Sequence, residues 1–115
     1  MKRGTKRVFG REKQQRKAFL KALLTALVMH HRIRTTVARA KTLRTVADKA
    51  VTQAKRGSPA SRRLLLRSVG TEAATKLVRD VAPKFADRAG GYTRVVKLNR
   101  RMSDGSPIAV VEFVA

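Results

Sequence analysis

The chain has 115 residues, enough for one domain with one modest core, and its apolar content of 43% is too high for an intrinsically disordered protein. Charge is the unusual quantity, because 28 Lys and Arg stand against 7 Asp and Glu and give a net charge of +21, which favours a polyanionic partner. The absence of cysteine excludes disulfides, thiolate nucleophiles and cysteine zinc sites, and no apolar run is long enough for a membrane span or a signal peptide.

The N-terminal segment MKRGTKRVFGREKQQRK, residues 1–17, is dense in positive charge and shows little periodicity at its start. We therefore expect a basic, partly extended arm over about residues 1–12 that becomes ordered when it binds a polyanion. Residues 1–115 are expected to form a single domain that carries this arm, because the chain shows no internal repeat and no dividing linker. The arm supplies five cationic candidates for phosphate contact: Lys2, Arg3, Lys6, Arg7 and Arg11.

A helix and then a strand are predicted after the arm. In KAFLKALLTALVMHH, residues 17–31, Phe19, Leu23 and Leu27 recur at helical spacing and predict an apolar helix face. The next six residues, RIRTTV, alternate with a period of two, as in a half-buried strand. One side of this strand would carry Ile33, Thr35 and Val37, and the other would present Arg32, Arg34 and Thr36.

Helical patterns fill the middle of the chain. Thr36 is a good N-cap for a second helix, which Gly57 ends. Ser58 and Pro59 open a short third helix that Gly70 ends. A fourth helix is expected to be capped by Thr71 and broken by Pro83. The buried stripe predicted on the second helix consists of Ala40, Leu43, Ala47, Ala50, Val51 and Ala54, and that on the fourth of Ala74, Leu77, Val78 and Val81.

Two strands are predicted at the C-terminal end. YTRVVKLN and IAVVEFVA are rich in β-branched residues, and Asp104-Gly105 between them is a strong turn signal, so the two segments should form an antiparallel hairpin. The order of elements is helix, strand, three helices, two strands. This order predicts a two-layer α/β (α+β) fold in which helices cover a small mixed sheet.

Catalytic chemistry is not evident in the sequence. The carboxylates are isolated, and the adjacent His30 and His31 cannot face the same way along a helix, so we expect one partly buried and one solvated imidazole. The chain has no nucleophile elbow and no phosphate loop. We therefore predict a protein that is not an enzyme and that uses no metal, no cofactor and no small-molecule substrate.

The segment RAGGYTRVVK, residues 88–97, leaves two interpretations open. Gly90 and Gly91 follow a helix break and precede a strand, which is the reverse of a nucleotide-binding loop. They serve either a turn or a close approach to a sugar-phosphate chain. Tyr92 either packs in the core or contacts RNA by stacking or through its hydroxyl. Lys55, by contrast, is expected to be a solvated charge.

Two motifs resemble the bacterial large-subunit ribosomal protein seventeen family. RIRTTVARAKTLR contains the Thr-Thr pair and the following Ala-Lys-x-Leu-Arg helix start, with Arg39 where that family usually has lysine. RAGGYTRVVKL contains an Arg-x-Gly-Gly-Tyr-Thr-Arg segment. The likeness extends over essentially the whole chain and departs at the start, where the family commonly begins Met-Arg-His. There Arg11, Arg16 and Lys17 are plausible equivalents of family residues.

This resemblance implies a structural constituent of the large ribosomal subunit that binds and stabilises rRNA near the peptide-tunnel exit. It implies neighbouring ribosomal proteins, including protein thirty-two, no membrane partner, and a cytoplasmic ribosome, with an organellar ribosome as an alternative. A DNA-binding nucleoid-type protein is the alternative function, since DNA would satisfy the same charge. Besides the five residues of the arm, the candidate RNA-binding residues are Arg16, Lys17, Arg32, Arg34, Thr35, Thr36, Lys41, Arg44, Arg88, Gly90, Gly91, Tyr92 and Arg94.

Overall fold

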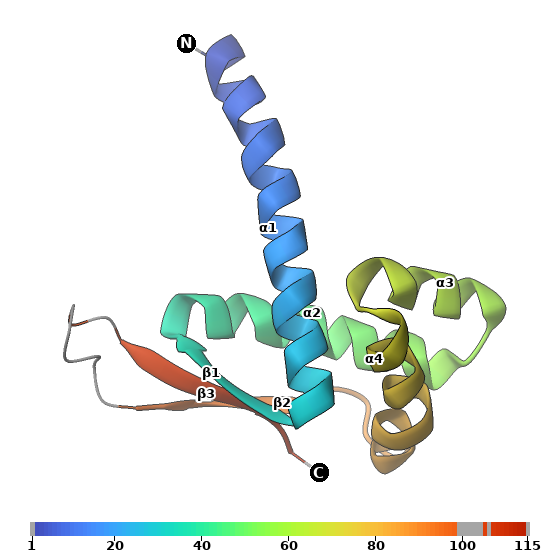
Figure 1. Cartoon of the computed structure of the whole chain (residues 1–115). Coiled ribbons are helices and arrows are strands. Elements are labelled where there is room, and N and C mark those ends of the chain that lie inside the picture. Colours follow the sequence, from blue (N-terminus) through green and yellow to red (C-terminus); the bar gives the residue numbers. More distant parts are fainter. Residues whose placement is uncertain (1, 99–104, 106, 115) are drawn as a thin grey trace.

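A computed structural model describes residues 2–98, 105 and 107–114, with side chains from Lys13 onward. A long helix, a strand and a second helix come first, followed by two shorter helices, two further helical turns and the C-terminal hairpin (Figure 1). The elements are α1 (Lys2–His30), β1 (Arg32–Thr36), α2 (Val37–Arg56), α3 (Pro59–Ser68), α4 (Thr71–Lys76), the π-helical turn η1 (Leu77–Val81), the 3-10 turn η2 (Ala82–Phe85), β2 (Thr93–Lys97) and β3 (Ile108–Phe113).

The three strands form an antiparallel sheet in the order β1-β3-β2. The predicted hairpin and the α/β class are therefore confirmed, whereas the prediction of a mixed sheet is wrong. β1 is held against β3 at both ends: the Val37 N–H donates to the Pro107 carbonyl at 3.1 Å, and the Phe113 N–H donates to the His31 carbonyl at 3.2 Å. β2 pairs antiparallel with the other edge of β3, so β3 is the central strand. Asp104 of the predicted turn lies outside the described residues, and Gly105 has a φ of 70°.

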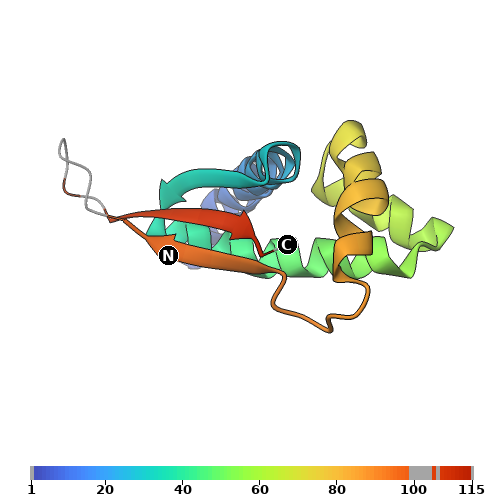
Figure 2. The ribbon, with the colours of Figure 1, turned by 90° about the horizontal axis from the view of Figure 1, so that it is seen from below.

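Helix α2 covers the inner face of the sheet. It contacts all three strands, and the view in Figure 2 shows the strands running along it. Its buried side is the predicted stripe of small and branched residues from Ala40 to Ala54. Both predicted ends of the helix are also confirmed: the Thr36 side chain accepts a hydrogen bond from the Arg39 N–H, and Gly57 ends the helix in the left-handed region with a φ of 68°.

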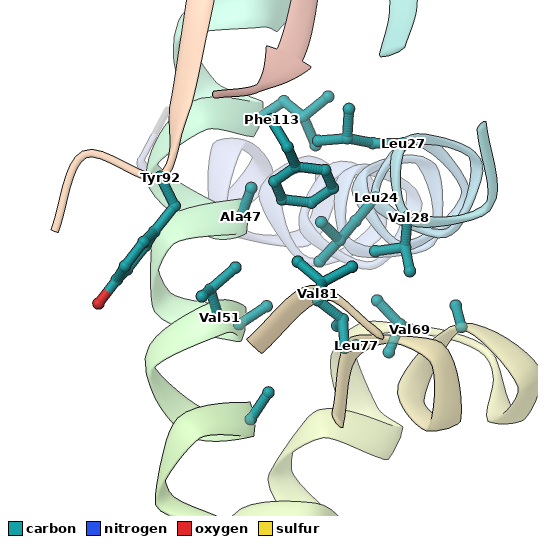
Figure 3. Close-up of a cluster of buried hydrophobic side chains, with 14 of the residues drawn as sticks. Leu24, Leu27, Val28, Ala47, Val51, Val69, Leu77, Val81, Tyr92 and Phe113 are labelled. Carbon is teal, nitrogen blue, oxygen red and sulfur yellow. The ribbon is translucent and has the colours of Figure 1, made fainter. Parts of the chain in front are cut away.

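The hydrophobic core lies between the sheet, α1, α2 and the α4 region (Figure 3). Leu24, Leu27 and Val28 of α1 are fully buried and meet Phe113 of β3 and Val81 of η1 in this cluster. Removing a buried Leu or Val side chain from water stabilises the fold by roughly 1.5–3 kcal/mol. The core thus begins in the C-terminal half of α1, and the N-terminal half extends beyond the other elements in Figure 1.

Three local predictions differ from the structure. Residues 2–12, expected as a partly extended arm, continue α1 as helix, since no proline interrupts this Lys- and Arg-rich segment. Gly70, and not Thr71, is the N-cap of α4, because the backbone turns between α3 and α4 one residue earlier than expected. The helical path does not end at Pro83: it passes from α4 through η1 into η2, whose first turn accommodates the proline.

Candidate nucleic-acid interface

The basic residues of the β1-α2 segment lie on two surfaces. Arg32 and Arg34 are exposed on the outer face of the sheet, because the alternation of β1 turns Ile33 and Thr35 inward. Lys41 and Arg44 lie on the exposed side of α2, the helix that covers the inner face. Thr35 is only 9% exposed, and the half-buried Thr36 is the N-cap of α2, so the predicted Thr-Thr pair positions this segment.

The outer face of the sheet mixes charge with apolar surface. The pairing register places Arg32, Glu112 and Arg94 in one row across the three strands. Arg94 Nε donates to Glu112 Oε1 at 2.8 Å, while the Arg94 side chain remains 60% exposed. The next row joins Arg34, Val110 and Val96. Arg94, a predicted contact residue, is therefore partly neutralised by Glu112, whereas no ion pair holds Arg34 in the described part of the chain.

A groove lies between α1 and α2. It is lined by Gln15, Arg16, Phe19 and Leu20 of α1 and by Ala38, Arg39 and Thr42 of α2. The guanidinium carbon of Arg39 lies 4.5 Å from the centroid of the Phe19 ring. Of the predicted contact residues, Arg16 reaches this groove, and Lys17 is exposed beside it on α1. Sequence reasoning assigned Phe19 to the apolar helix face and did not select Arg39 as a contact residue.

The Gly-Gly-Tyr segment is a turn that packs against the C-terminal half of α2. Arg88 Nε donates to the Gly90 carbonyl at 3.2 Å, and Gly91 has a φ of 61°, which glycine adopts without strain. Tyr92 is only 2% exposed, its ring centroid lies 5.0 Å from that of Phe85, and its hydroxyl donates to the Arg88 carbonyl at 3.1 Å. The structure therefore places the Tyr92 ring in the core, which is one of the two environments that the sequence left open.

Lys55 belongs to the same cluster. Its ammonium group donates to the Arg88 carbonyl and, at 3.2 Å, to the Tyr92 hydroxyl, and it lies 5.2 Å from the centroid of the Tyr92 ring. The expectation of a solvated charge is wrong, because the turn after η2 folds back onto α2 and half-buries the side chain. Arg88 and Gly90 remain exposed at the outer edge of this turn.

The two histidines lie at the junction of α1 and β1. His30 is exposed, and His31 is half-buried with its ring edge-on to Phe113 at 5.9 Å, which confirms the predicted pair of environments. Burial, together with the ammonium groups of Lys84 and Lys76, lowers the pKa of His31 below its usual 6.5. His31 is thus favoured as a neutral ring in the folded protein.

The structure describes residues 2–98, 105 and 107–114, and these ranges show neither a metal-binding cluster nor a membrane span. Nowhere in these ranges do three or more His, Asp or Glu side chains gather as metal ligands would. The helices of the described chain are not both long and apolar enough to cross a membrane. The five candidate residues of the arm lie along the N-terminal half of α1: Lys2, Arg3, Lys6, Arg7 and Arg11.

Comparison with known proteins places the chain in a family. The family model described as Ribosomal protein L17 matches residues 19–114. A relative from Shouchella clausii named large ribosomal subunit protein bL17 is 45% identical over 114 residues, which cover 91% of this chain and 95% of the relative. Relatives of the same name from Thermodesulfovibrio yellowstonii and Clostridium botulinum are 47% and 44% identical over 109 residues, 94% of this chain and 82% and 96% of the relatives. The chain therefore belongs to the ribosomal protein L17 family.

Proposed function

We propose that this chain is a structural, non-catalytic constituent of the large ribosomal subunit that binds and stabilises large-subunit rRNA. The observation that carries this proposal is the family match over residues 19–114, together with relatives that are named as large-subunit ribosomal proteins. The net charge of +21 gives the physical reason, because a chain with 28 cationic and 7 anionic side chains needs a polyanion for neutralisation.

The proposed mechanism is phosphate neutralisation on several faces of one folded chain. Exposed guanidinium and ammonium groups project from the sheet, from the exposed side of α2 and from α1, so separate RNA segments can be held together. Tyr92, Thr35 and Thr36 act indirectly, because they fix the turn and the helix start that carry the exposed groups. The proposed contact residues with described side chains are Arg16, Lys17, Arg32, Arg34, Lys41, Arg44, Arg88 and Arg94, with backbone approach at Gly90 and Gly91.

The proposed location is the side of the large subunit near the peptide-tunnel exit, in a cytoplasmic ribosome, with other ribosomal proteins, including protein thirty-two, as neighbours. Family membership supports this location.

Sedimentation tests the proposal. A tagged chain expressed in bacteria should travel with large subunits through a high-salt cushion and should be absent from the DNA fraction of the same lysate. Its release at moderate salt into a small DNA-bound fraction would instead favour the nucleoid-type alternative. High salt separates the two alternatives, because a chain that is held by phosphate contacts alone dissociates as the salt concentration rises.

A further inference from the structure

Phe19 differs in exposure from the other Phe and Tyr rings whose side chains the structure describes. Tyr92, Phe85 and Phe113 are 2%, 2% and 6% exposed, whereas Phe19 is 44% exposed. It lies on α1 at the point where the helix leaves the core, one turn before the partly buried Leu23 and two turns before the fully buried Leu27. An aromatic ring held at the surface in this way has unsatisfied apolar area that a planar ligand could cover.

The surroundings of Phe19 carry positive charge and neutral hydrogen-bonding groups. The Arg39 guanidinium lies 4.5 Å from the ring centroid, and Arg16 lines the same groove from α1. Gln15 and Thr42 supply an amide and a hydroxyl, and none of the described residues that line the groove carries a carboxylate. The first turn of α2, which forms one wall, also contains no acidic residue, so the positive end of its helix dipole is not neutralised there.

We propose that this groove, between Gln15–Leu20 of α1 and Ala38–Thr42 of α2, binds an unpaired RNA base that stacks on Phe19 and Arg39. The occupant follows from the chemistry of the lining. The Arg39 guanidinium lies over the Phe19 ring, so a base can stack on the guanidinium plane and on the exposed part of the ring. The amide and the hydroxyl can bond the edge of the base, and the two arginines match the flanking phosphates. Paired bases in a helix cover each other's faces, so the base must come from a bulge, a loop or an end.

The charge of the lining separates this ligand from an apolar protein segment. An apolar peptide would leave Arg16 and Arg39 without counter-charges, whereas a nucleotide supplies both a stacking face and a phosphate. The inference rests on the proposed RNA-binding function and adds a specific recognition element to it. It also assigns roles to Phe19 and Arg39, which sequence patterns did not select.

A bulged hairpin containing 2-aminopurine tests the proposal with the full-length chain. The comparison hairpin has the same number of phosphates but pairs the 2-aminopurine within the stem. We expect the wild-type chain to prefer the bulged hairpin and to quench its fluorescence on binding. Phe19→Leu should weaken binding to the bulged hairpin by about tenfold or more and abolish the quenching, because it removes the stacking face.

The same set of variants includes controls for net charge and for folding. Phe19→Leu keeps the net charge, so the dependence of affinity on salt should not change, whereas loss of a phosphate contact would reduce it. Phe19→Trp should restore both affinity and quenching. Leu64→Ala, which truncates a 43% exposed apolar residue on α3, is the matched control and should bind as the wild type does.

The hairpin measurements and a cross-link distinguish a base-binding groove from phosphate binding alone. Equal binding of both hairpins with no response to Phe19→Leu would overturn the base site and leave phosphate binding intact. Failure of the wild-type chain to bind either hairpin would overturn the base site and the proposed function together. In assembled large subunits, a photo-cross-linking residue at Gln15 should attach to RNA, and attachment to a protein chain instead would overturn the proposal.

Discussion

Lys55, Arg88 and Tyr92 illustrate how single residues with polar side chains can serve the fold in a highly basic protein. The Lys55 ammonium and the Tyr92 hydroxyl both donate to the Arg88 carbonyl, which ties the turn before β2 to α2. Figure 3 shows the Tyr92 hydroxyl directed away from the labelled aliphatic cluster, while the ring lies against the core. Packing of the ring and the internal hydrogen bond of the hydroxyl account for this tyrosine without a contact to RNA.

Tyr92→Phe is therefore expected to change stability and to leave RNA binding unchanged. The ring would keep its packing against Phe85, and the loss of one internal hydrogen bond should lower the free energy of unfolding by about 1 kcal/mol in urea titrations. Affinity for rRNA, measured at a temperature where both proteins are folded, should remain the same. A weakened affinity with unchanged stability would show that the hydroxyl contacts RNA instead.

Gly90 and Gly91 are expected to differ in their tolerance of a side chain. Gly91 has a φ of 61°, so Gly91→Ala should lower the free energy of unfolding by about 1–2 kcal/mol. Gly90 lies outside the left-handed region, and a Cβ there would meet nothing within 4 Å, so Gly90→Ala should be neutral or stabilising by up to about 1 kcal/mol. Thermal unfolding of the two variants is the measurement. Equal losses from both would contradict this assignment of the turn.

At the scale of elements, local signals in the sequence predicted α2 and the hairpin well. Thr36 and Gly57 determine the ends of α2 through their own side chain and backbone, and the alternation of β1 depends on adjacent residues. Two features depend on contacts between residues far apart in the sequence, and local sequence patterns could not predict them. The central position of β3 results from contacts of His31 and Val37 with residues near 110, and the α1-α2 groove forms between Phe19 and Arg39.

The N-terminal half of α1 provides a test at this scale. Replacing its five candidate cations by glutamine should make the logarithm of the affinity for rRNA less dependent on the logarithm of salt concentration, by about 3.5–4.5 in slope if all five contact phosphates. The substituted residues are Lys2, Arg3, Lys6, Arg7 and Arg11. Stability should change little, because Leu24, Leu27 and Val28, with which α1 enters the core, lie in the other half of the helix.

A second five-glutamine variant supplies the matched control. It removes the same charge from exposed residues that were not selected as contacts: Arg56, Arg62, Arg63, Arg67 and Arg79. Its salt dependence should change much less than that of the first variant. Equal changes in both variants would mean that binding reflects net charge alone and that the N-terminal half of α1 has no particular role.

The whole molecule carries a net charge of +21 and measures 45 × 37 × 23 Å. At about 0.01 M ionic strength the Debye length is roughly 30 Å, so cations on opposite sides of the folded chain still repel each other. Among the described side chains the ion pair that offsets this repulsion is Arg94–Glu112. Composition alone indicated the repulsion among cations, and the fold adds that exposed cations lie on the outer sheet face, on α1 and on α2.

The free protein should therefore become more stable as sodium chloride is added. Raising the salt from about 0.01 M to about 0.5 M screens repulsion that the compact state suffers more than the unfolded chain, so the melting temperature should rise. The rRNA complex should respond in the opposite direction, because salt weakens the phosphate contacts that stabilise the folded chain. Calorimetry of both samples measures the two trends, and the five-glutamine variants should show a smaller rise when free. A melting temperature of the free protein that falls with salt would mean that attractive ion pairs outweigh the repulsion among its 28 cationic side chains.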